Sequence, residues 1–382
     1  MLRYLTAGES HGKALVAIIE GFPAGVSVTK ADIDQELAKR QRGYGRGGRM
    51  KIEKDQVEIL SGIRNGRTLG SPITLMIENK DWPNWIDTMS SEEIRAQSPL
   101  TRPRPGHADL AGALKYGHDD LRDVLERASA RETAARVAVG AVAKCLLRLF
   151  KINVLAYVVS LGPIEIQQRE MDPVSAARIV EASSFRSLAD REDELIRLVD
   201  EVKEQGDSLG GVFEVVAWNV PVGLGSYVHW ERKLDGRLAQ ALMSIQGIKG
   251  VEVGEGFAAA AQLGSQVHDE IVHEAGEYGH RTNRSGGIEG GMSNGEPIIL
   301  RAAMKPIPTL YKPLLSVDMQ TKQEVAAGIE RSDVCAVPAA SVVGEAVVAF
   351  ELASALLEKF GGDSRREIMA NFENYQKALF AR

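Results

Sequence analysis

Residues 129–150 read SARETAARVAVGAVAKCLLRLF, a run dominated by small and apolar side chains. Ser129 and Glu132 stand three residues apart before this run, which is the spacing of a capping box, so we predict a helix from Ala130 to Phe150. Because its small residues allow close packing on more than one face, we expect this helix inside the protein. Residues 339–360, AASVVGEAVVAFELASALLEKF, have the same character. Two such helices predict an internal helical layer covered on both sides by sheets.

The segments around these helices indicate strands and further helices. Apolar runs predict strands at residues 57–60, 73–77, 151–162, 210–221 and 297–306, and two more on either side of the turn at residues 8–12. Amphipathic patterns predict helices at residues 30–41, twice between 172 and 205, and once after residue 231. No tandem repeat or low-complexity linker interrupts the chain, so we expect one large α/β domain over residues 1–382.

Composition limits the classes of function. The chain has 382 residues and a net charge of −6, so it is not a general binder of polyanions. Its two cysteines, Cys145 and Cys335, give no disulfide framework, which favours a reducing cytoplasm. Because the N-terminus lacks a signal-peptide pattern and no uncharged apolar stretch of membrane-spanning length occurs, we expect no membrane partner. The histidines in HDEIVHEAGEYGH, residues 268–280, do not follow a zinc spacing, so we expect no metal.

Positive charge is concentrated just before the first internal helix. The segment from Thr101 to Arg136 carries Arg102, Arg104, His107, Arg127, Arg131 and Arg136 around the expected helix start. That start leaves backbone N–H groups and the positive end of the helix dipole pointing outward, which suits a phosphate. The neighbouring prolines hold His107 in a rigid, non-helical segment, where it suits proton donation or hydrogen bonding to a charged ligand. The alternative is that these arginines only keep the surface soluble.

Two segments in the first fifty residues also carry polar groups that suit a ligand. In GESHG, residues 8–12, the glycines let the backbone approach a ligand while Ser10 and His11 supply a hydroxyl and an imidazole. A hairpin with both side chains in water is the alternative. RGYGRGGRMK, residues 42–51, is either a basic strip that binds RNA or a flexible loop that closes over a phosphorylated small molecule. Because the segment is short and a strand follows at once, we prefer the loop.

The C-terminal half offers two further candidates. Glycines between residues 286 and 295 leave backbone exposed before the strand that ends near Lys305, which suits a planar or phosphorylated cofactor. A flexible turn would have the same composition. Asp333 lies just before the second internal helix, so its carboxylate suits either a base or a cap for that helix.

Ten segments of the chain, taken in order, resemble the chorismate synthase family. They are AGESHGKALVAIIEGFPAG, RQRGYGRGGRM, VEILSG, RPGHAD, KYG, RASARETAARVAVGA, QGIKGVEVGEGF, GGIEGGMSNGEPI, KPIPT and RSDVCAVP. All ten occur in the family's order, and together they cover nearly the whole chain.

The resemblance implies a fold and a reaction. The family's fold is a β-α-β sandwich of the α+β class, with an internal layer of long helices between antiparallel sheets, and its usual assembly is a homotetramer. It carries out a 1,4-anti elimination of phosphate from 5-enolpyruvylshikimate 3-phosphate. The product, chorismate, is the last common intermediate of the shikimate pathway toward aromatic amino acids. The reaction requires reduced FMN although no net redox change occurs.

The resemblance also implies roles for individual residues. His11 matches the histidine that protonates the departing phosphate, His107 the one that hydrogen-bonds the reduced flavin, and Asp333 the carboxylate that passes on the proton lost from the substrate ring. Flavin-contacting positions match Arg127, Ala128, Ser129, Gln246, Gly247, Gly295, Lys305, Pro306, Ile307, Pro308, Thr309 and Arg331. Ser10, Arg40, Arg46, Arg49 and Arg131 match groups that bind the substrate or, for Arg40 and Arg46, NADP.

One position departs from the family's pattern, and one alternative function stays open. Ala128 stands where many members have serine, so we expect flavin binding there through the backbone N–H. An NADPH-dependent flavin oxidoreductase would share the flavin site, although no GxGxxG follows a strand to hold a dinucleotide. NADPH would be the reductant if this chain reduced its own flavin. Since the insertions of bifunctional members are not recognised in the sequence, we expect an external flavin reductase as partner, and no nucleic acid.

Overall fold

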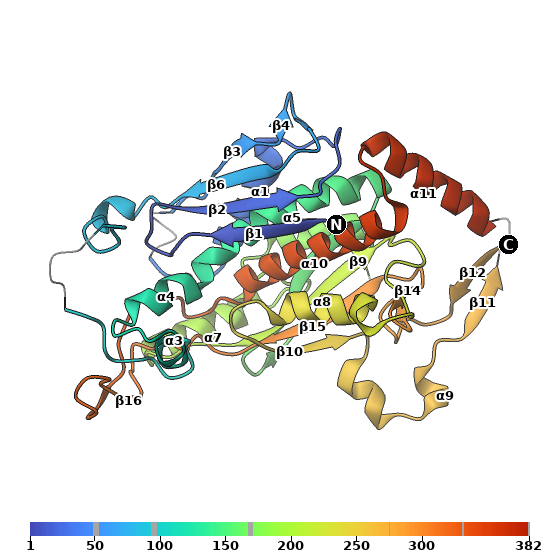
Figure 1. Cartoon of the computed structure of the whole chain (residues 1–382). Coiled ribbons are helices and arrows are strands. Elements are labelled where there is room, and N and C mark those ends of the chain that lie inside the picture. The colour runs from blue at the N-terminus through green and yellow to red at the C-terminus, as the bar shows by residue number, and fades with distance from the viewer. Residues whose placement is uncertain (49–52, 93–97, 167–170, 275, 331, 381–382) are drawn as a thin grey trace.

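Two antiparallel sheets enclose a layer of helices in this protein (Figure 1). The computed structural model describes residues 1–48, 53–92, 98–166, 171–274, 276–330 and 332–380. A hydrophobic core joins the layers and runs from Leu2 through the inner helices to Phe372. The arrangement is the β-α-β sandwich with internal helices that the sequence led us to expect.

The first sheet has the strand order β1-β2-β6-β3. Its strands are β1 (Arg3–Ala7), β2 (Ala14–Glu20), β6 (Ile73–Glu78) and β3 (Val57–Ser61), and every neighbouring pair is antiparallel. Along β6, Ile73, Leu75 and Ile77 are buried toward the helices, since successive side chains of a strand point to opposite faces. The strands predicted at 57–60 and 73–77 are therefore neighbours in one sheet.

The second sheet has the strand order β10-β15-β9-β7-β8 and is also antiparallel throughout. Its strands are β10 (Ile248–Val253), β15 (Ile298–Met304), β9 (Gly211–Trp218), β7 (Asn153–Leu161) and β8 (Ile164–Glu165). The middle of β9 is buried on both faces, where Val215 belongs to the main core and Val216 to a smaller cluster on the outer side. Burial on both sides explains the apolar run over residues 215–218.

The internal layer is built around α5 (Thr133–Leu147) and α10 (Val337–Phe360), flanked by α1 (Lys30–Gln41) and α8 (Leu234–Met243). Short 3₁₀ turns, η2 (Ala130–Glu132) and η3 (Arg148–Phe150), extend α5 at both ends, as the predicted helix from Ala130 to Phe150 requires. At Gly140 the two main helices approach closely, because a Cβ there would lie 2.4 Å from the Cβ of Ala346 and 2.5 Å from its Cα. Only a residue without a side chain fits this crossing.

The start of the first internal helix differs from the expected capping box. The Ser129 hydroxyl does cap the helix, accepting a hydrogen bond from the Arg131 backbone N–H at 3.2 Å. The Glu132 carboxylate instead accepts hydrogen bonds from Arg136 Nε at 3.0 Å and from the Thr6 hydroxyl at 2.8 Å. Glu132 is buried beneath β1, and an arginine one helical turn later offers it a charge-assisted bond that the backbone cannot match.

Shorter elements surround the sandwich. They are β4 (Ile63–Arg64), β5 (Arg67–Thr68), η1 (Trp82–Asn84), α3 (Asp109–Tyr116), α4 (Arg122–Ala128), α6 (Pro173–Ala182), α7 (Glu192–Glu204), η4 (Trp230–Arg232), η5 (Gly256–Ala261), α9 (Gly264–Val267), β11 (Ile271–Glu274), β12 (Glu277–His280), β13 (Ile288–Glu289), β14 (Met292–Ser293), β16 (Leu315–Val317), β17 (Glu324–Ala326) and α11 (Arg365–Phe380). In Figure 1, α3, α4 and β16 lie at the end of the molecule opposite to α11 and the β11–β12 hairpin.

Among the described residues, α10 is the helix that is long and apolar enough to cross a membrane by length and composition alone. In its most apolar window, however, 83% of the residues are buried inside the protein. α10 packs on α5 and α8 within the layer and on β7 and β9 of the second sheet. It is therefore the central core helix of the sandwich.

Candidate active site

A cavity of about 500 Å³ opens at the end of the sandwich where both internal helices begin. Residues 128–131, at the start of α5, line it together with Ala339, Ala340 and Val343 from the first turns of α10. The first N–H groups of a helix have no partners within the helix and carry its positive dipole end, so both starts favour a negative charge nearby. The volume lies within the usual range for small-molecule sites. The cavity therefore suits a small anionic molecule.

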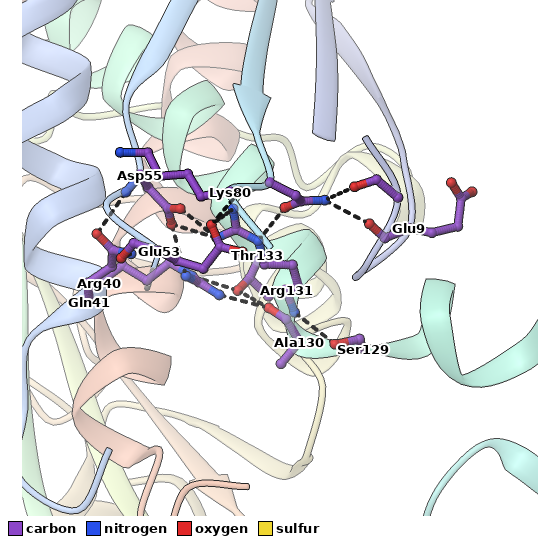
Figure 2. Close-up of polar contacts among 12 residues, drawn as sticks. Glu9, Arg40, Gln41, Glu53, Asp55, Lys80, Ser129, Ala130, Arg131 and Thr133 are labelled. Atoms are coloured by element: carbon purple, nitrogen blue, oxygen red, sulfur yellow. Dashed lines mark hydrogen bonds and ion pairs between the residues drawn. The ribbon is translucent and has the colours of Figure 1, made fainter. Parts of the chain in front are cut away.

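A buried cluster of charges forms one wall of the cavity (Figure 2). Asp55 receives two hydrogen bonds from Arg131 Nη1, at 2.6 Å and 2.8 Å, and lies 3.5 Å from Arg40 Nη1. Arg40 also donates to the Thr133 hydroxyl at 2.9 Å and to the Ala130 carbonyl at 3.0 Å. Both arginines are only 4% exposed. They line the cavity, but their charges are compensated inside the protein.

The same cluster joins segments that are distant in the sequence (Figure 2). Asn79 accepts a hydrogen bond from Arg131 Nε at 2.9 Å and donates to the carbonyls of Glu9 and Gly12. The Glu53 carboxylate accepts from the backbone N–H of the residue after Asn79, at 3.0 Å. The segment before β3, the turn after β6 and the β1–β2 turn are thereby fixed to the start of α5.

His11 lies in the β1–β2 turn, and two other segments hold its ring. Its Nδ1 is 2.9 Å from Glu126 Oε1 on α4, and its backbone N–H donates to Glu126 Oε2 at 2.8 Å. The Trp85 ring stacks on the imidazole with centroids 3.9 Å apart. Burial alone raises the pKa of the Glu126 carboxyl, but the hydrogen bond and charge of His11 outweigh it, so this pKa lies below its ordinary value. A buried carboxylate and an aromatic ring thus fix His11 at the cavity.

His107 is held in the same manner by another carboxylate. Its Nδ1 lies 2.5 Å from Asp109 Oδ1, at the start of α3. Arg104 donates to Asp109 Oδ2 at 2.8 Å and, on the other side, to the Thr309 hydroxyl at 3.0 Å. Burial alone raises the pKa of the Asp109 carboxyl, but the hydrogen bonds from His107 and Arg104 hold it well below the usual range. These contacts tie the segment before α3 to the segment after β15.

Asp333 fastens the arginine-rich loop to the cavity. Its Oδ2 lies 2.8 Å from Arg46 Nη1, and its Oδ1 accepts a hydrogen bond from the Gly47 backbone N–H at 2.6 Å. The loop preferred over an RNA-binding strip therefore meets the residues before α10 at the same cavity. Arg49 and Arg331, which were also predicted at the site, lie outside the described residues.

Most positions matched to flavin contacts line the cavity. They are Ala128, Ser129, Gln246, Gly247 and the segment from Lys305 to Thr309. Within the part of the chain that the structure describes, Gln246 Oε1 is a buried acceptor without a hydrogen-bond partner. The Lys305 ammonium donates to the Gly106 carbonyl, and burial together with the charge of Lys249 lowers its pKa. An unpaired buried acceptor beside cationic groups fits a ligand that carries both N–H donors and negative charge.

Two predicted residues lie away from the cavity. Arg127 donates to the carbonyls of Thr6 and Gly8, each at 3.0 Å, because successive side chains of α4 point in different directions around the helix. Gly295 precedes β15 while Lys305 follows it, and a strand of seven residues spans roughly 23 Å. The glycine-rich segment and the lysine, which we expected to form one site, are therefore at opposite ends of a strand.

Three side chains that shape the site were missed by the sequence analysis: Glu126, Trp85 and Asp109. Asp109 follows His107 by two residues, so the RPGHAD segment carried a usable signal. Glu126 is 115 residues away from His11. No local pattern links such a pair, because only the fold brings α4 against the β1–β2 turn.

Known proteins resemble this chain over its whole length. A family model described as chorismate synthase matches residues 2–357. Proteins named chorismate synthase from Desulforamulus reducens and Pelobacter propionicus are 60% and 62% identical to it, covering 99% and 98% of this chain and the same shares of their own lengths. A solved structure described as the crystal structure of chorismate synthase is 47% identical, with a TM-score of 0.82, covering 100% of this chain and 99% of its own.

Proposed function

Because this chain belongs to the chorismate synthase family, we propose that the cavity at the start of its two internal helices is the active site. The enzyme is a lyase that eliminates phosphate from 5-enolpyruvylshikimate 3-phosphate to give chorismate for aromatic amino acid biosynthesis. The observation that carries our choice of cavity is that His11, His107 and Asp333 converge on it together with six arginine and lysine side chains. The family match favours this reaction over the alternative of an NADPH-dependent flavin oxidoreductase.

Reduced FMN is the cofactor in this proposal, and the residues lining the cavity fit it. Gln246 offers a buried carbonyl acceptor, and Lys305 with the helix starts offers positive charge for the flavin's phosphate group. The residues that would hold the cofactor are Ala128, Ser129, Gln246, Gly247, Lys305, Pro306, Ile307, Pro308 and Thr309, with Arg331 added from the family pattern. When bound, reduced FMN supplies transient electron donation as the C–O bond of the substrate breaks. Arg127 and Gly295 are left out of this set because they lie away from the cavity.

The basic groups of the cavity would bind the anionic substrate. A departing phosphate needs its developing charge neutralised, and arginines together with a proton donor meet that need. Arg46, Arg49 and Ser10 are proposed to contact the substrate anions. Arg40 and Arg131, which are tied to Asp55, would position the wall against which the substrate binds.

Proton transfer is assigned to three side chains. His11 would give a proton to the departing phosphate, and His107 would hydrogen-bond the reduced flavin and stabilise its negative charge. Asp333 would receive the proton lost from the substrate ring. Since Asp333 is paired with Arg46, an anion that draws Arg46 away would free the carboxylate for this proton.

Further properties of the family are proposed for this chain as well. We infer that the protein is a cytoplasmic homotetramer and that each chain forms one catalytic domain. The single domain is supported by one hydrophobic core that extends from Leu2 to Phe372. An external flavin reductase would keep the FMN reduced. If the chain reduced its flavin itself, NADPH would bind near Arg40 and Arg46.

The experiment that tests the function is anaerobic. The protein is mixed with photoreduced FMN and 5-enolpyruvylshikimate 3-phosphate, and chorismate absorbance is followed together with phosphate release. We expect both products in equal amounts, none with oxidised FMN, and a rate lowered about 100-fold or more in His11→Ala or His107→Ala. Bound flavin without product would contradict the proposal, and steady oxidation of added NADPH by oxidised FMN in a second reaction without 5-enolpyruvylshikimate 3-phosphate would support the oxidoreductase.

A further inference from the structure

Glu126 makes contacts at this site that imply more than a structural role. It lies on α4 and is 2% exposed. Its carboxylate contacts His11 twice, because Oε2 accepts the backbone N–H of His11 while Oε1 lies beside the ring nitrogen Nδ1. Its own backbone carbonyl accepts the N–H of Ser10 at 3.0 Å. Glu126 therefore holds both the backbone and the side chain of the β1–β2 turn in one orientation.

The Glu126 contact determines which ring nitrogen of His11 carries a fixed proton. An ionised carboxylate can only accept hydrogen bonds, and the low pKa of Glu126 keeps it ionised at neutral pH. The 2.9 Å contact to Nδ1 therefore requires a proton on that nitrogen in either charge state of the ring. The proton that can be gained and lost is the one on Nε2.

Other charged groups around His11 act less directly. Arg122, also on α4, lies 3.5 Å from Glu126 Oε1, and its guanidinium is 5.2 Å from the centre of the Trp85 ring. Asp81 accepts from Trp85 Nε1 at 3.1 Å and so fixes the ring that stacks on the imidazole. Arg131 lines the same cavity but is bound to Asp55. Glu126 contacts the imidazole itself, with Oε1 2.9 Å from Nδ1.

The second histidine of the site also has a buried carboxylate at Nδ1, although there Arg104 Nη2 lies 3.1 Å from the same nitrogen. His107 Nδ1 faces the buried carboxylate of Asp109, as His11 Nδ1 faces that of Glu126. The two carboxylates come from different helices, α3 and α4, and the two histidines from unrelated segments. In hydrolytic enzymes a buried carboxylate on Nδ1 orients the imidazole and stabilises its protonated form while the other nitrogen exchanges the proton.

We propose that Glu126 is a positioning residue for the elimination: it fixes the proton of His11 on Nδ1 and stabilises the imidazolium, so that Nε2 gives its proton to the departing phosphate. The inference rests on the proposed role of His11 as the acid. When Nε2 gives up this proton, the phosphate oxygen gains it and the neutral ring keeps its Nδ1–H against Glu126.

The test compares the pH dependence of the anaerobic reaction in Glu126→Gln and in wild type. Glutamine still accepts hydrogen bonds from His11 but has no charge, so the protonated ring is less stabilised. We expect the alkaline limb of the profile to move to lower pH by about one unit or more, with the rate recovering toward wild type at the acid end. Asp123→Asn is the matched control, because it removes a charge from a carboxylate of α4 that is 60% exposed and pairs with His118. The alkaline limb of the Asp123→Asn profile should coincide with that of wild type.

A merely structural Glu126 would give a different profile. A rate that falls equally at every pH, or a profile that coincides with wild type, would overturn the inference. His11→Asn separates this result from failure of the proposed function. If His11→Asn were fully active, His11 would not be the acid of the reaction. If His11→Asn were slow but the alkaline limb of Glu126→Gln coincided with that of wild type, only the role of Glu126 would be overturned.

A measurement on the wild-type protein covers the case in which Glu126→Gln does not fold. The seven histidines are labelled with ¹⁵N, and the His11 signals are assigned by their absence from His11→Asn. At alkaline pH, where the rings are neutral, the ¹⁵N shifts report the tautomer. We expect the His11 proton on Nδ1, and a proton on Nε2 would refute the proposal.

Discussion

Replacing Asp55 by asparagine should destabilise the protein far more than its single lost charge suggests. The Asp55 carboxylate lies between two guanidinium groups, bonded to Arg131 at 2.6 Å and 2.8 Å and 3.5 Å from Arg40. Both arginines are 4% exposed, so water cannot replace the lost charge. Breaking a buried ion pair from one side costs about 3–5 kcal/mol, because the partner charge stays buried. We expect the free energy of unfolding of Asp55→Asn to fall by that amount.

Urea unfolding of the wild type and two variants measures this effect. Glu270→Gln is the control, since Glu270 pairs with Arg281 at 2.8 Å while both side chains are more than 65% exposed. An exposed pair contributes at most about 1 kcal/mol, so its midpoint should stay near that of wild type. If Asp55→Asn lost no more stability than Glu270→Gln, at equal slopes of the unfolding curves, our account of the cavity wall would be refuted.

Three further predictions concern the helical layer. Gly140→Ala should lower the free energy of unfolding by about 1–3 kcal/mol, because its methyl group would overlap α10. Gly236→Ala is the control and should not lower it, because a Cβ there would meet nothing within 4 Å. Thermal unfolding of the two variants and the wild type measures the difference. Burial raises the pKa of the Cys145 thiol to about 11 and that of the Cys335 thiol to about 12. A thiol reagent at pH 8 should therefore modify neither cysteine in the native protein but both in urea. Rapid reaction of either thiol in the native state would contradict this prediction. Burial alone raises the pKa of the Glu36 carboxyl, but the charges of two neighbouring lysines outweigh burial and lower this pKa from 4.5 to about 2. The ionised Glu36 carboxylate therefore stabilises the fold fully above pH 4.5, and this stabilisation is lost as the pH falls toward 2. The difference in the free energy of unfolding between wild type and Glu36→Gln should therefore become smaller from neutral pH to pH 3. A difference that stays constant with pH would contradict this prediction.

The sequence predicted the layers of this fold because each layer has a local pattern. Small and apolar residues without a polar face marked α5 and α10, and the predicted limits of the first internal helix agree with the structure. Apolar runs marked β1, β2, β3, β6, β7, β9 and β15 in the same way. Such patterns depend on neighbours in the chain, so they can be read before the fold is known.

The partners of the charged groups could not be predicted in this way. The arginines at positions 40 and 131 were expected to face a ligand, but in the structure Asp55 binds both of them from inside the wall. Glu132 was expected to cap a helix and is instead bonded to Arg136 and Thr6. Glu126 had no visible link to His11. A buried charge takes the nearest opposite charge in space, and sequence separation carries no information about that distance.

The position of α10 in the chain has a consequence for synthesis on the ribosome. A helix of this length and apolarity would expose a long apolar surface if it emerged without a place to pack. Both sheets and the partner helix α5 precede α10 in the sequence, so the groove that receives it is already translated when residues 337–360 leave the exit tunnel. The order of translation therefore lets this apolar helix pack as soon as it emerges.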